Sequence, residues 1–198
     1  MSDYTWPAAW LPKRFQLRVA STTRAFTSPY TAGMQVLDLM ADYWRCELDM
    51  TPDNSTALGG QIEAFFDRLK GNANRILLWN LKRPAPLGTL RGTPTLAAAV
   101  AQLANTCSIQ TAAGATLLAG DMLGMGGQLV RVMADTVANG SGVMAVEFAP
   151  RARAAIASGS AVTWSAPTAP FRLVSDGAPV DWRPGMFEAP SIELREDV

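Results

Sequence analysis

The sequence predicts a mainly β protein with one α-helix and a small β-domain inserted into a larger scaffold. Short segments near both ends alternate apolar and polar residues, as half-buried strands do. A single stretch has helical spacing. The middle of the chain, residues 89–166, is poor in charge and rich in Ala, Gly, Thr and Val, whereas its flanks are aromatic, charged and punctuated by proline. We therefore expect a scaffold of residues 1–88 and 167–198 around an insert of residues 89–166.

Composition narrows the class of protein. The 198 residues suffice for one large or two small domains, and a hydrophobic fraction of 48% supports packed cores. The 17 basic and 17 acidic residues cancel, which argues against a general nucleic-acid binder and leaves little repulsion against self-association. The first residues do not resemble a signal peptide, and no apolar run reaches membrane-spanning length. We expect a protein made in a cytoplasm, without a membrane partner.

The N-terminal segment contains Trp6, Trp10 and two prolines, Pro7 and Pro12. Proline cannot donate to a β-ladder, so the segment is expected to be extended and outside the sheet. Two tryptophans in such a segment indicate docking, either onto the core of the same subunit or onto a neighbour. The sequence leaves both open.

The scaffold strands follow from alternation. Residues 15–19 predict a first strand, and residues 24–33 read as a loop because they contain Ser, Pro and Gly. Residues 34–39 and 42–50 predict two more strands, and we expect residues 34–40 and 43–50 to pair as a hairpin. In the latter strand Trp44, Cys46, Leu48 and Met50 share one face.

One helix follows. Ser55 or Thr56 can cap it, its apolar stripe comprises Leu58, Ile62, Phe65 and Leu69, and Gly71 marks its end. Gly59 and Gly60 are expected to weaken its first turn. Residues 75–79 then predict a strand, and residues 83–88 a connector.

The insert has the chemistry of β-hairpins. Residues 120–124, 126–127 and 139–142 indicate turns, and residues 128–133, 143–148 and 159–164 predict strands. Residues 150–156 suggest a short helical turn. Short strands with glycine turns predict a small barrel or sandwich.

After the insert, residues 171–174 and 190–195 predict strands, with a turn at Asp176-Gly177. The N-terminal strands are their natural partners, so most of the β-pairing is expected to be non-local. Cys46 and Cys107 belong to different proposed domains, and free buried thiols are favoured over a disulfide.

No motif supports catalysis, a metal or a cofactor. The chain has no histidine, which excludes Ser-His-Asp and Cys-His catalysis and removes the commonest zinc ligand. The run Gly120–Gly127 lacks the lysine and spacing of a phosphate loop. Glu47 and Asp49 share a strand face with Arg45 and are better explained as solvated, as are Glu193 and Glu196. Arg151 and Arg153 likewise read as a solvated pair, although they can contact an acidic partner. We expect no enzyme.

Aromatic residues in irregular, proline-bearing segments are the better candidates for a contact surface. Trp44 and Trp79 lie in strand patterns and are expected in the core. The candidate subunit or partner contacts are Trp6, Trp10, Tyr30, Trp182 and Phe187, with Arg24 as a polar anchor.

Several segments together resemble the distal tail proteins of long-tailed bacteriophages and phage-like particles. They are Trp6-Pro7, the Arg24–Tyr30 loop, the strand Tyr43–Met50, the helix end Phe65–Gly71, and the insert pieces Leu118–Asp121 and Val146–Pro150. The resemblance covers most of the chain as a pattern of elements and includes no catalytic motif.

The resemblance implies a structural role in the virion. Members of the family form hexameric rings between the tail tube and the baseplate or receptor-binding parts. Their scaffold is a β-sandwich with one helix, related to the tail-tube fold, and a second β-domain decorates the ring. The expected partners are therefore copies of the chain, the tail tube protein and tail-tip hub or baseplate proteins. The expected location is the phage tail tip, after synthesis in the host cytoplasm.

Three other functions are compatible with the sequence. A carbohydrate-binding tail-tip module requires exposed tryptophan on the insert, where only Trp164 occurs. Another tail ring, such as a tube or tail-completion protein, would lack a decorating second domain. A carboxylate-dependent glycosidase would need a convergent pair of acidic residues.

Overall fold

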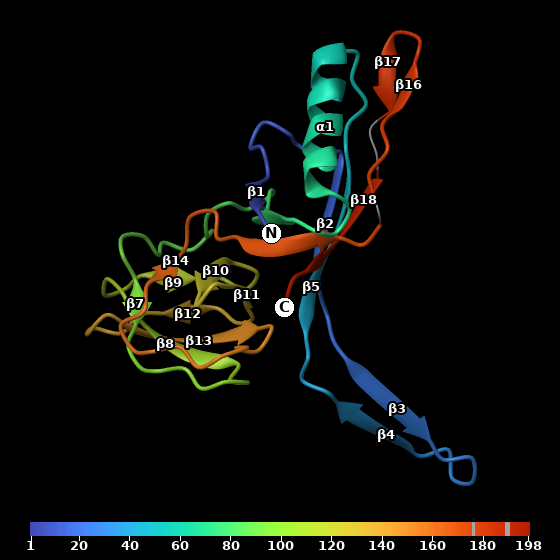
Figure 1. Ribbon diagram of the computed structural model, residues 1–198. Coiled ribbons are helices and arrows are strands. Elements are labelled where there is room, and N and C mark those ends of the chain that lie inside the picture. The colour runs from blue at the N-terminus through green and yellow to red at the C-terminus, as the bar shows by residue number, and fades with distance from the viewer. Residues whose placement is uncertain (176, 189–190) are drawn as a thin grey trace.

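The computed structural model describes residues 1–175, 177–188 and 191–198. It contains two six-stranded sheets, three two-stranded ones and a single helix in these residues. Figure 1 shows the two larger sheets side by side, with one hairpin projecting away from both. The prediction of a mainly β protein with one helix is confirmed.

The scaffold is built on a mixed sheet with the strand order β1-β6-β15-β18-β5-β2. Only β1 and β6 pair in parallel; the other neighbours are antiparallel. Strands from the C-terminal end thus pair with strands from the N-terminal end, as predicted. The strands are β1 (Asp3–Thr5), β2 (Arg14–Ala20), β5 (Tyr43–Asp49), β6 (Arg75–Leu78), β15 (Ala169–Leu173) and β18 (Ser191–Glu196).

The buried face of this sheet is set by β5. Trp44, Cys46 and Leu48 are fully buried, and the residues between them are partly exposed, which confirms the predicted alternation. Helix α1 (Thr56–Leu69) packs into the same hydrophobic core. The scaffold strands form one hydrogen-bonded sheet and not two separate stacked sheets.

Helix α1 begins where the sequence places its N-cap, and its C-cap is Lys70, one residue before the predicted Gly71. The Oγ of Ser55 accepts a hydrogen bond from the Leu58 N–H at 3.2 Å, and Lys70 adopts a left-handed conformation just beyond the last turn. Of the predicted stripe, Ile62 and Leu69 are buried, whereas Leu58 and Phe65 pack against the core only partly buried. Phe66 is buried against the sheet, whereas Phe65 is only partly buried and faces the N-terminal segment.

The insert is a nearly closed, antiparallel barrel-like sheet with the order β14-β10-β11-β13-β8-β7, and an isolated bridge between Thr95 and Ala161 joins its two edges. A continuous hydrophobic core of residues between Leu90 and Val162 fills its interior. The strands are β7 (Thr95–Leu96), β8 (Thr106–Gln110), β10 (Met122–Met125), β11 (Gln128–Val132), β13 (Val143–Ala149) and β14 (Val162–Thr163), with β9 (Thr116–Leu117) and β12 (Thr136–Val137) paired beside them.

Several predicted details of the insert are wrong. The residues between Gly120 and Gly126 include strand β10, because the turn needs only Gly126 and Gly127, which both have positive φ. Residues 150–156 form no helical turn: Pro150 follows a cis peptide bond, and Ile156 makes a β-bridge to Val100. The closing strand spans only Val162–Thr163, and β8 was not predicted.

The predicted hairpin of residues 34–40 with 43–50 is also wrong. Strand β4 (Met34–Asp38) pairs instead with β3 (Thr23–Thr27), inside the segment predicted as a loop, while β5 pairs with β2 and β18. The Ser, Pro and Gly residues form only the tip of the β3–β4 hairpin. A third small hairpin consists of β16 (Asp181–Arg183) and β17 (Met186–Glu188). The predicted turn at Asp176 lies outside the described residues.

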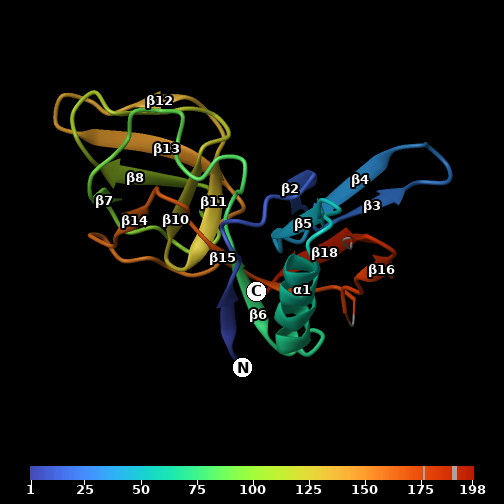
Figure 2. The same ribbon diagram turned by 90° about the horizontal axis from the view of Figure 1, so that it is seen from above.

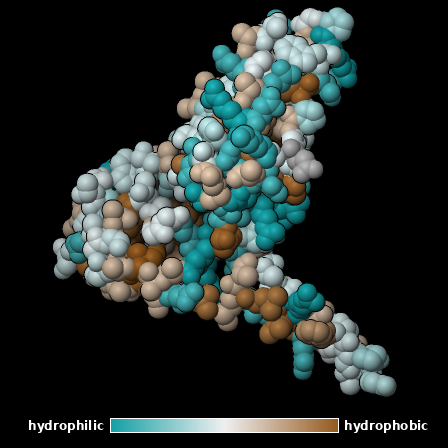
Figure 3. Space-filling model, viewed as in Figure 1, coloured by the Kyte–Doolittle hydropathy of each residue, from teal (hydrophilic) through white to brown (hydrophobic). Residues whose placement is uncertain are grey.

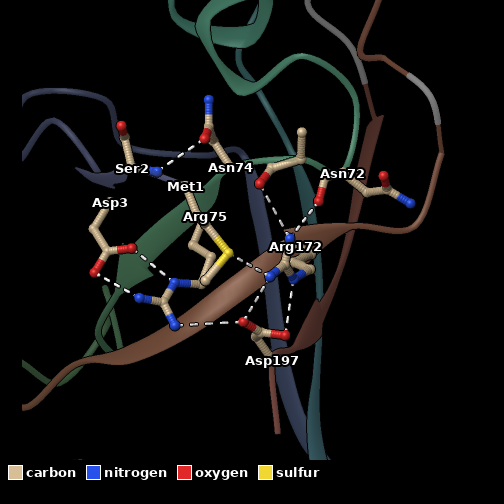
Figure 4. A network of polar contacts seen from close by, with 9 residues as sticks. Met1, Ser2, Asp3, Asn72, Asn74, Arg75, Arg172 and Asp197 are labelled. Carbon is tan, nitrogen blue, oxygen red and sulfur yellow. Dashed lines mark hydrogen bonds and ion pairs between the residues drawn. The ribbon is translucent and has the colours of Figure 1, made fainter.

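An ion-pair network fastens the short edge strand β1 and the C-terminal residues to the scaffold (Figure 4). Arg75 binds Asp3 at 2.7 Å and Asp197 at 3.5 Å, and Arg172 binds Asp197 at 2.8 Å. The hydrogen bond from Arg172 is the main cause that lowers the pKa of Asp197. The network therefore joins β1, β6, β15 and the end of β18.

Candidate interaction surfaces

The β3–β4 hairpin is the most exposed element of the molecule. We call residues 23–38 the arm. Every residue of β3 and β4 is exposed to solvent, and both Figures 1 and 2 show the hairpin reaching beyond the rest of the chain. Large apolar side chains are nevertheless concentrated here. They are Phe26, Tyr30, Met34, Val36 and Leu37, followed at the base by Leu39 and Met40.

These apolar residues lie on both faces of the arm. The register pairs Arg24 with Leu37 and Ala25 with Val36. Residues directly opposite each other share a face, so Leu37 and Phe26 lie on the face that carries Arg24, whereas Met34 and Val36 lie on the other. Figure 3 shows hydrophobic surface along the part of the arm nearest the body. Burying only one face would therefore leave apolar surface in water.

The tip of the arm is an ordered turn. The Ser28 N–H donates to the Gly33 carbonyl at 2.9 Å, and the Ala32 N–H donates to the Ser28 carbonyl at 3.1 Å. Tyr30, at this turn, is 94% exposed. Of the predicted contact residues, Arg24 and Tyr30 thus lie on the arm, about one strand length apart.

An isolated two-stranded hairpin is marginally stable in water, and exposed apolar surface of this kind marks a contact site. Within the part of the chain that the structure describes, the outer edges of both strands are unpaired and can accept a further strand. The arm thus has the physical properties of a segment that becomes buried in an assembly.

The other predicted contact residues are placed differently. Trp6 and Trp10 are buried in the subunit's own core. The sequence left open whether they dock onto their own subunit or onto a neighbour, and in the structure they dock onto their own subunit. The Trp6 indole N–H donates to the Trp10 carbonyl at 3.0 Å, and both rings pack edge-on against Phe65. These two tryptophans offer no exposed surface to a neighbour.

Phe187 and Trp182 belong to the β16–β17 hairpin. Phe187 is fully buried and is therefore a core residue of this chain. Trp182 is 46% exposed, and its indole N–H donates to the Glu63 carboxylate of α1 at 2.6 Å. Of this pair only Trp182 contributes to the surface.

The outer face of the scaffold sheet carries a lattice of ion pairs. Glu47 lies within 4.0 Å of Arg14, Arg18 and Arg45, and Asp49 accepts a hydrogen bond from Ser191. Glu193 pairs with Arg45 on the same face. These carboxylates are thus matched by cations, as a solvated polar face requires.

Glu196, Arg151 and Arg153 are not simply solvated, contrary to the prediction. Glu196 continues the inward side of β18 after Ile192 and Leu194, and its residue exposure is 3%. Both of its carboxylate oxygens accept from Arg153, and the Trp44 backbone N–H donates to one of them at 2.7 Å. The acidic partners of the two arginines lie in this same chain, since Arg151 binds Asp38 and Asp42.

The insert is fastened to the scaffold by this region and by β11. The Trp44 indole N–H donates to the Leu129 carbonyl at 2.7 Å, and the Arg131 guanidinium lies over the Trp44 ring. Arg131 also donates to the Leu17 carbonyl. Desolvation at this interface lowers the pKa of Arg131. Met122 and Leu129 of the insert complete the scaffold core.

The glycine-rich run of the insert has a structural role that the sequence did not reveal. The Asp121 carboxylate is buried and accepts the backbone N–H groups of Leu87, Gly88 and Leu118 at 2.8 to 3.1 Å. It thereby fixes the connector that leads into the insert. The only sequence signal for this role is an aspartate directly after Gly120 in a turn-rich run.

The described residues include no group of three or more Cys, Asp or Glu arranged to hold a metal ion. Within the same residues, no helix has the length and apolarity needed to cross a bilayer. Cys46 and Cys107 are free and buried. Trp164 is partly buried against the insert core, and Arg91 lies over its ring.

No protein-family model matches the chain, and no curated protein is significantly similar to it in sequence. The arm residues Phe26, Met34, Val36 and Leu37 are the functional candidates that the sequence reasoning missed. Two five-residue extended segments separated by a Ser-Pro-Tyr-Thr-Ala-Gly turn were the available signal.

Proposed function

We propose that the chain is a structural component of a phage tail tip, a distal tail protein whose copies form a closed ring, six-membered as the resemblance implies. The ring would join the tail tube to the baseplate or receptor-binding apparatus. The arm is the observation that carries the proposal, because its two apolar faces and unpaired strand edges need a partner.

A second copy of the chain is the partner that these features favour. The arm projects from one side of the scaffold (Figure 2), and in this proposal it meets a different surface on its neighbour. Such a head-to-tail contact closes into a ring when its rotation divides a full turn. A net charge of zero leaves little long-range repulsion between copies. In this proposal the scaffold is related to the tail-tube fold.

The insert favours a decorated ring over a tube or tail-completion protein. It forms a barrel-like sheet with its own hydrophobic core, in addition to the scaffold core. The same observation weighs against a carbohydrate-binding module, because side chains fill the barrel. Trp164 also has one ring face occupied by Arg91.

The test is the mass of the purified protein by native mass spectrometry, with negative-stain images of the same sample. We expect one closed oligomer with a central channel, formed either alone or when purified tail tubes are added as a template. Tail tubes are added because ordering the side chains and loops of an interface costs free energy, and binding to a template can offset this cost.

The matched variants are Phe26→Ser with Val36→Ser, one substitution on each arm face, against Leu87→Ser in the connector. Leu87 is as exposed as Val36 but lies outside the arm. We expect the arm variant alone to lose assembly. A wild-type protein that remains monomeric at high concentration and does not bind tail tubes would overturn the proposal.

A further inference from the structure

The arm continues the β2–β5 ribbon, but the two strands are unequal where it leaves the sheet. The register of β2 with β5 ends at Ala20 opposite Tyr43, and that of β3 with β4 begins at Thr23 opposite Asp38. Ser21 and Thr22 therefore lie opposite the longer segment 39–42. We call these residues the base bulge.

A bulge of this kind bends a ribbon and increases its twist. Met40 in the longer segment has φ of 54°, a left-handed conformation that is unusual for a residue with a side chain. Two hydrogen bonds cross the base bulge, from the Leu39 N–H to the Thr22 carbonyl at 2.9 Å and from the Thr22 hydroxyl to the Ala41 carbonyl at 2.8 Å. The direction of the arm is decided at this point.

Arg151 of the insert spans the longer side of the base bulge. One guanidinium nitrogen lies 2.9 Å from Asp38, the last residue of β4, and another lies 3.8 Å from Asp42, immediately before β5. Asp38 also accepts the Met40 N–H at 2.9 Å. These two contacts, first that from Met40 and then that from Arg151, lower the pKa of Asp38.

The backbone that carries Arg151 is itself fixed. The Gln128 side chain is buried; its amide donates to the Arg151 carbonyl at 2.8 Å, and its oxygen accepts the Arg153 N–H at 3.1 Å. Arg153 is held in turn by the buried Glu196. Arg151 is therefore presented to the base bulge from a rigid support in the insert.

Among the described residues, the contact with Arg151 is the only ion pair or hydrogen bond that joins arm residues 23–38 to the insert. We infer that Arg151 is a positioning residue, which sets the angle between the arm and the body by fastening both ends of the longer bulge segment to the insert. The insert thus does more than decorate the scaffold: it aims the arm. The angle does not depend on the proposed ring, but its effect on ring closure rests on that proposed function.

The experiment measures the arm angle in dilute, monomeric protein by pulsed electron–electron double resonance. One spin label is attached at Tyr30→Cys on the tip and the other at Ala64→Cys on α1, both of which are exposed positions. A second pair, Ala113→Cys in the insert with Ala64→Cys, reports whether the body itself changes. The native cysteines are buried.

Two variants remove the contact from opposite sides. Arg151→Gln removes the guanidinium, and Asp38→Asn removes the charge while its remaining oxygen can still accept the Met40 N–H. Arg183→Gln is the matched control, because it breaks the ion pair with Glu188 in the β16–β17 hairpin, away from the arm. We expect the narrow tip-to-helix distribution to be lost in the first two and retained in the control.

The double variant Arg151→Gln with Asp38→Asn should broaden the distribution no further than Arg151→Gln alone, because that change already removes the contacts of Arg151 with both Asp38 and Asp42. The Ala113–Ala64 distance should stay narrow throughout. An unchanged tip distribution in Arg151→Gln and Asp38→Asn overturns the inference, as does equal broadening of the Ala113–Ala64 pair. A wild type that has a narrow tip distribution when dilute, but stays monomeric at high concentration and does not bind tail tubes, would contradict the ring and leave the inference intact.

Discussion

Gly59 lies near the start of α1 and faces the aromatic side chains of the β16–β17 hairpin. A Cβ atom at this position would lie 2.6 Å from the Trp182 ring and 3.1 Å from Phe187. The sequence suggested only that Gly59 weakens the helix, because its spatial neighbours are more than a hundred residues away. Its neighbour Gly60 has open space around the same position.

Substitution of these two glycines should therefore have different effects. Gly60→Ala should raise the free energy of unfolding by about 0.5–1 kcal/mol, the usual helix preference of alanine over glycine. Gly59→Ala should lose that gain or destabilise the protein, because Trp182 must move. Urea unfolding gives the free energies, and tryptophan fluorescence reports Trp182. Equal stabilisation by both changes would show that the hairpin does not pack on α1 as described.

Burial changes the pKa values, and hence the reactivity, of the two cysteine thiols. Burial raises the pKa of Cys46 to about 12, with a further contribution from the negative charge of Glu47, and burial raises that of Cys107 to about 11. The thiolate is the reactive form, so both thiols should be inert in the folded protein.

We expect a thiol reagent at pH 8 to label neither cysteine in buffer and both in urea. Raised pKa values in the folded state also mean that the neutral thiols contribute stability that is complete below pH 9 and is lost as the pH rises toward 11 and 12. Replacement of both cysteines by alanine should flatten this alkaline part of the stability profile. Rapid labelling of the native protein would contradict their burial.

At the scale of elements, the arm is separable from the folded body. None of its residues belongs to either hydrophobic core. The Leu39 N–H donates to the Thr22 carbonyl, so the two ends of the arm are already adjacent. The fold therefore does not require the exposed apolar surface of the arm, and the proposed subunit contact would account for it.

Replacement of residues 23–38 by an Asn-Gly turn should leave the midpoint of thermal unfolding nearly unchanged while it abolishes self-association. Asn-Gly suits a two-residue hairpin connection. Differential scanning calorimetry and native mass spectrometry measure the two properties on one sample. A large loss of thermal stability would mean that the arm supports the fold, and persistent oligomers would place the subunit contact elsewhere.

The elements show which parts of the fold a sequence can specify. Strand β5 and helix α1 were predictable because one face of each is buried, which imposes a period on the residues. The arm strands were harder, since a hairpin exposed on both faces has no such period. Arg24 and Tyr30 of the arm were named as contact candidates and are exposed, but their contact role stays a prediction. Trp6, Trp10 and Phe187 were named as contact candidates too, and they are buried. Irregular backbone around an aromatic residue does not reveal whether the same chain covers it.

For the molecule as a whole, the important contact is the buried ion pair between the insert and the scaffold. Arg153 comes from the insert, Glu196 is the last residue of β18, and the Trp44 backbone N–H donates to the same carboxylate. A buried carboxylate that loses its partners is strongly unfavourable, so the two bodies are expected to unfold together.

Glu196→Ala should lower the free energy of unfolding by about 3–5 kcal/mol, as expected for breaking a buried ion pair, and should separate the unfolding of insert and scaffold. Glu193→Ala, on the opposite face of the same strand, should cost at most about 1 kcal/mol because its pair with Arg45 is partly exposed. Urea titrations followed by circular dichroism make the comparison. Similar losses in the two variants would show that Glu196 does not couple the bodies.

The base bulge has a mechanical consequence for the whole molecule, because the arm behaves as a lever with its fulcrum there. From Thr23 to Ser28 an extended chain spans about 17 Å, so a rotation of about 7° at the fulcrum moves the start of the tip turn by about 2 Å. That displacement approaches half of the roughly 4.8 Å that separates neighbouring strands in a sheet. A partner strand at the tip would thus gain or lose its alignment through changes made at the opposite end of the lever.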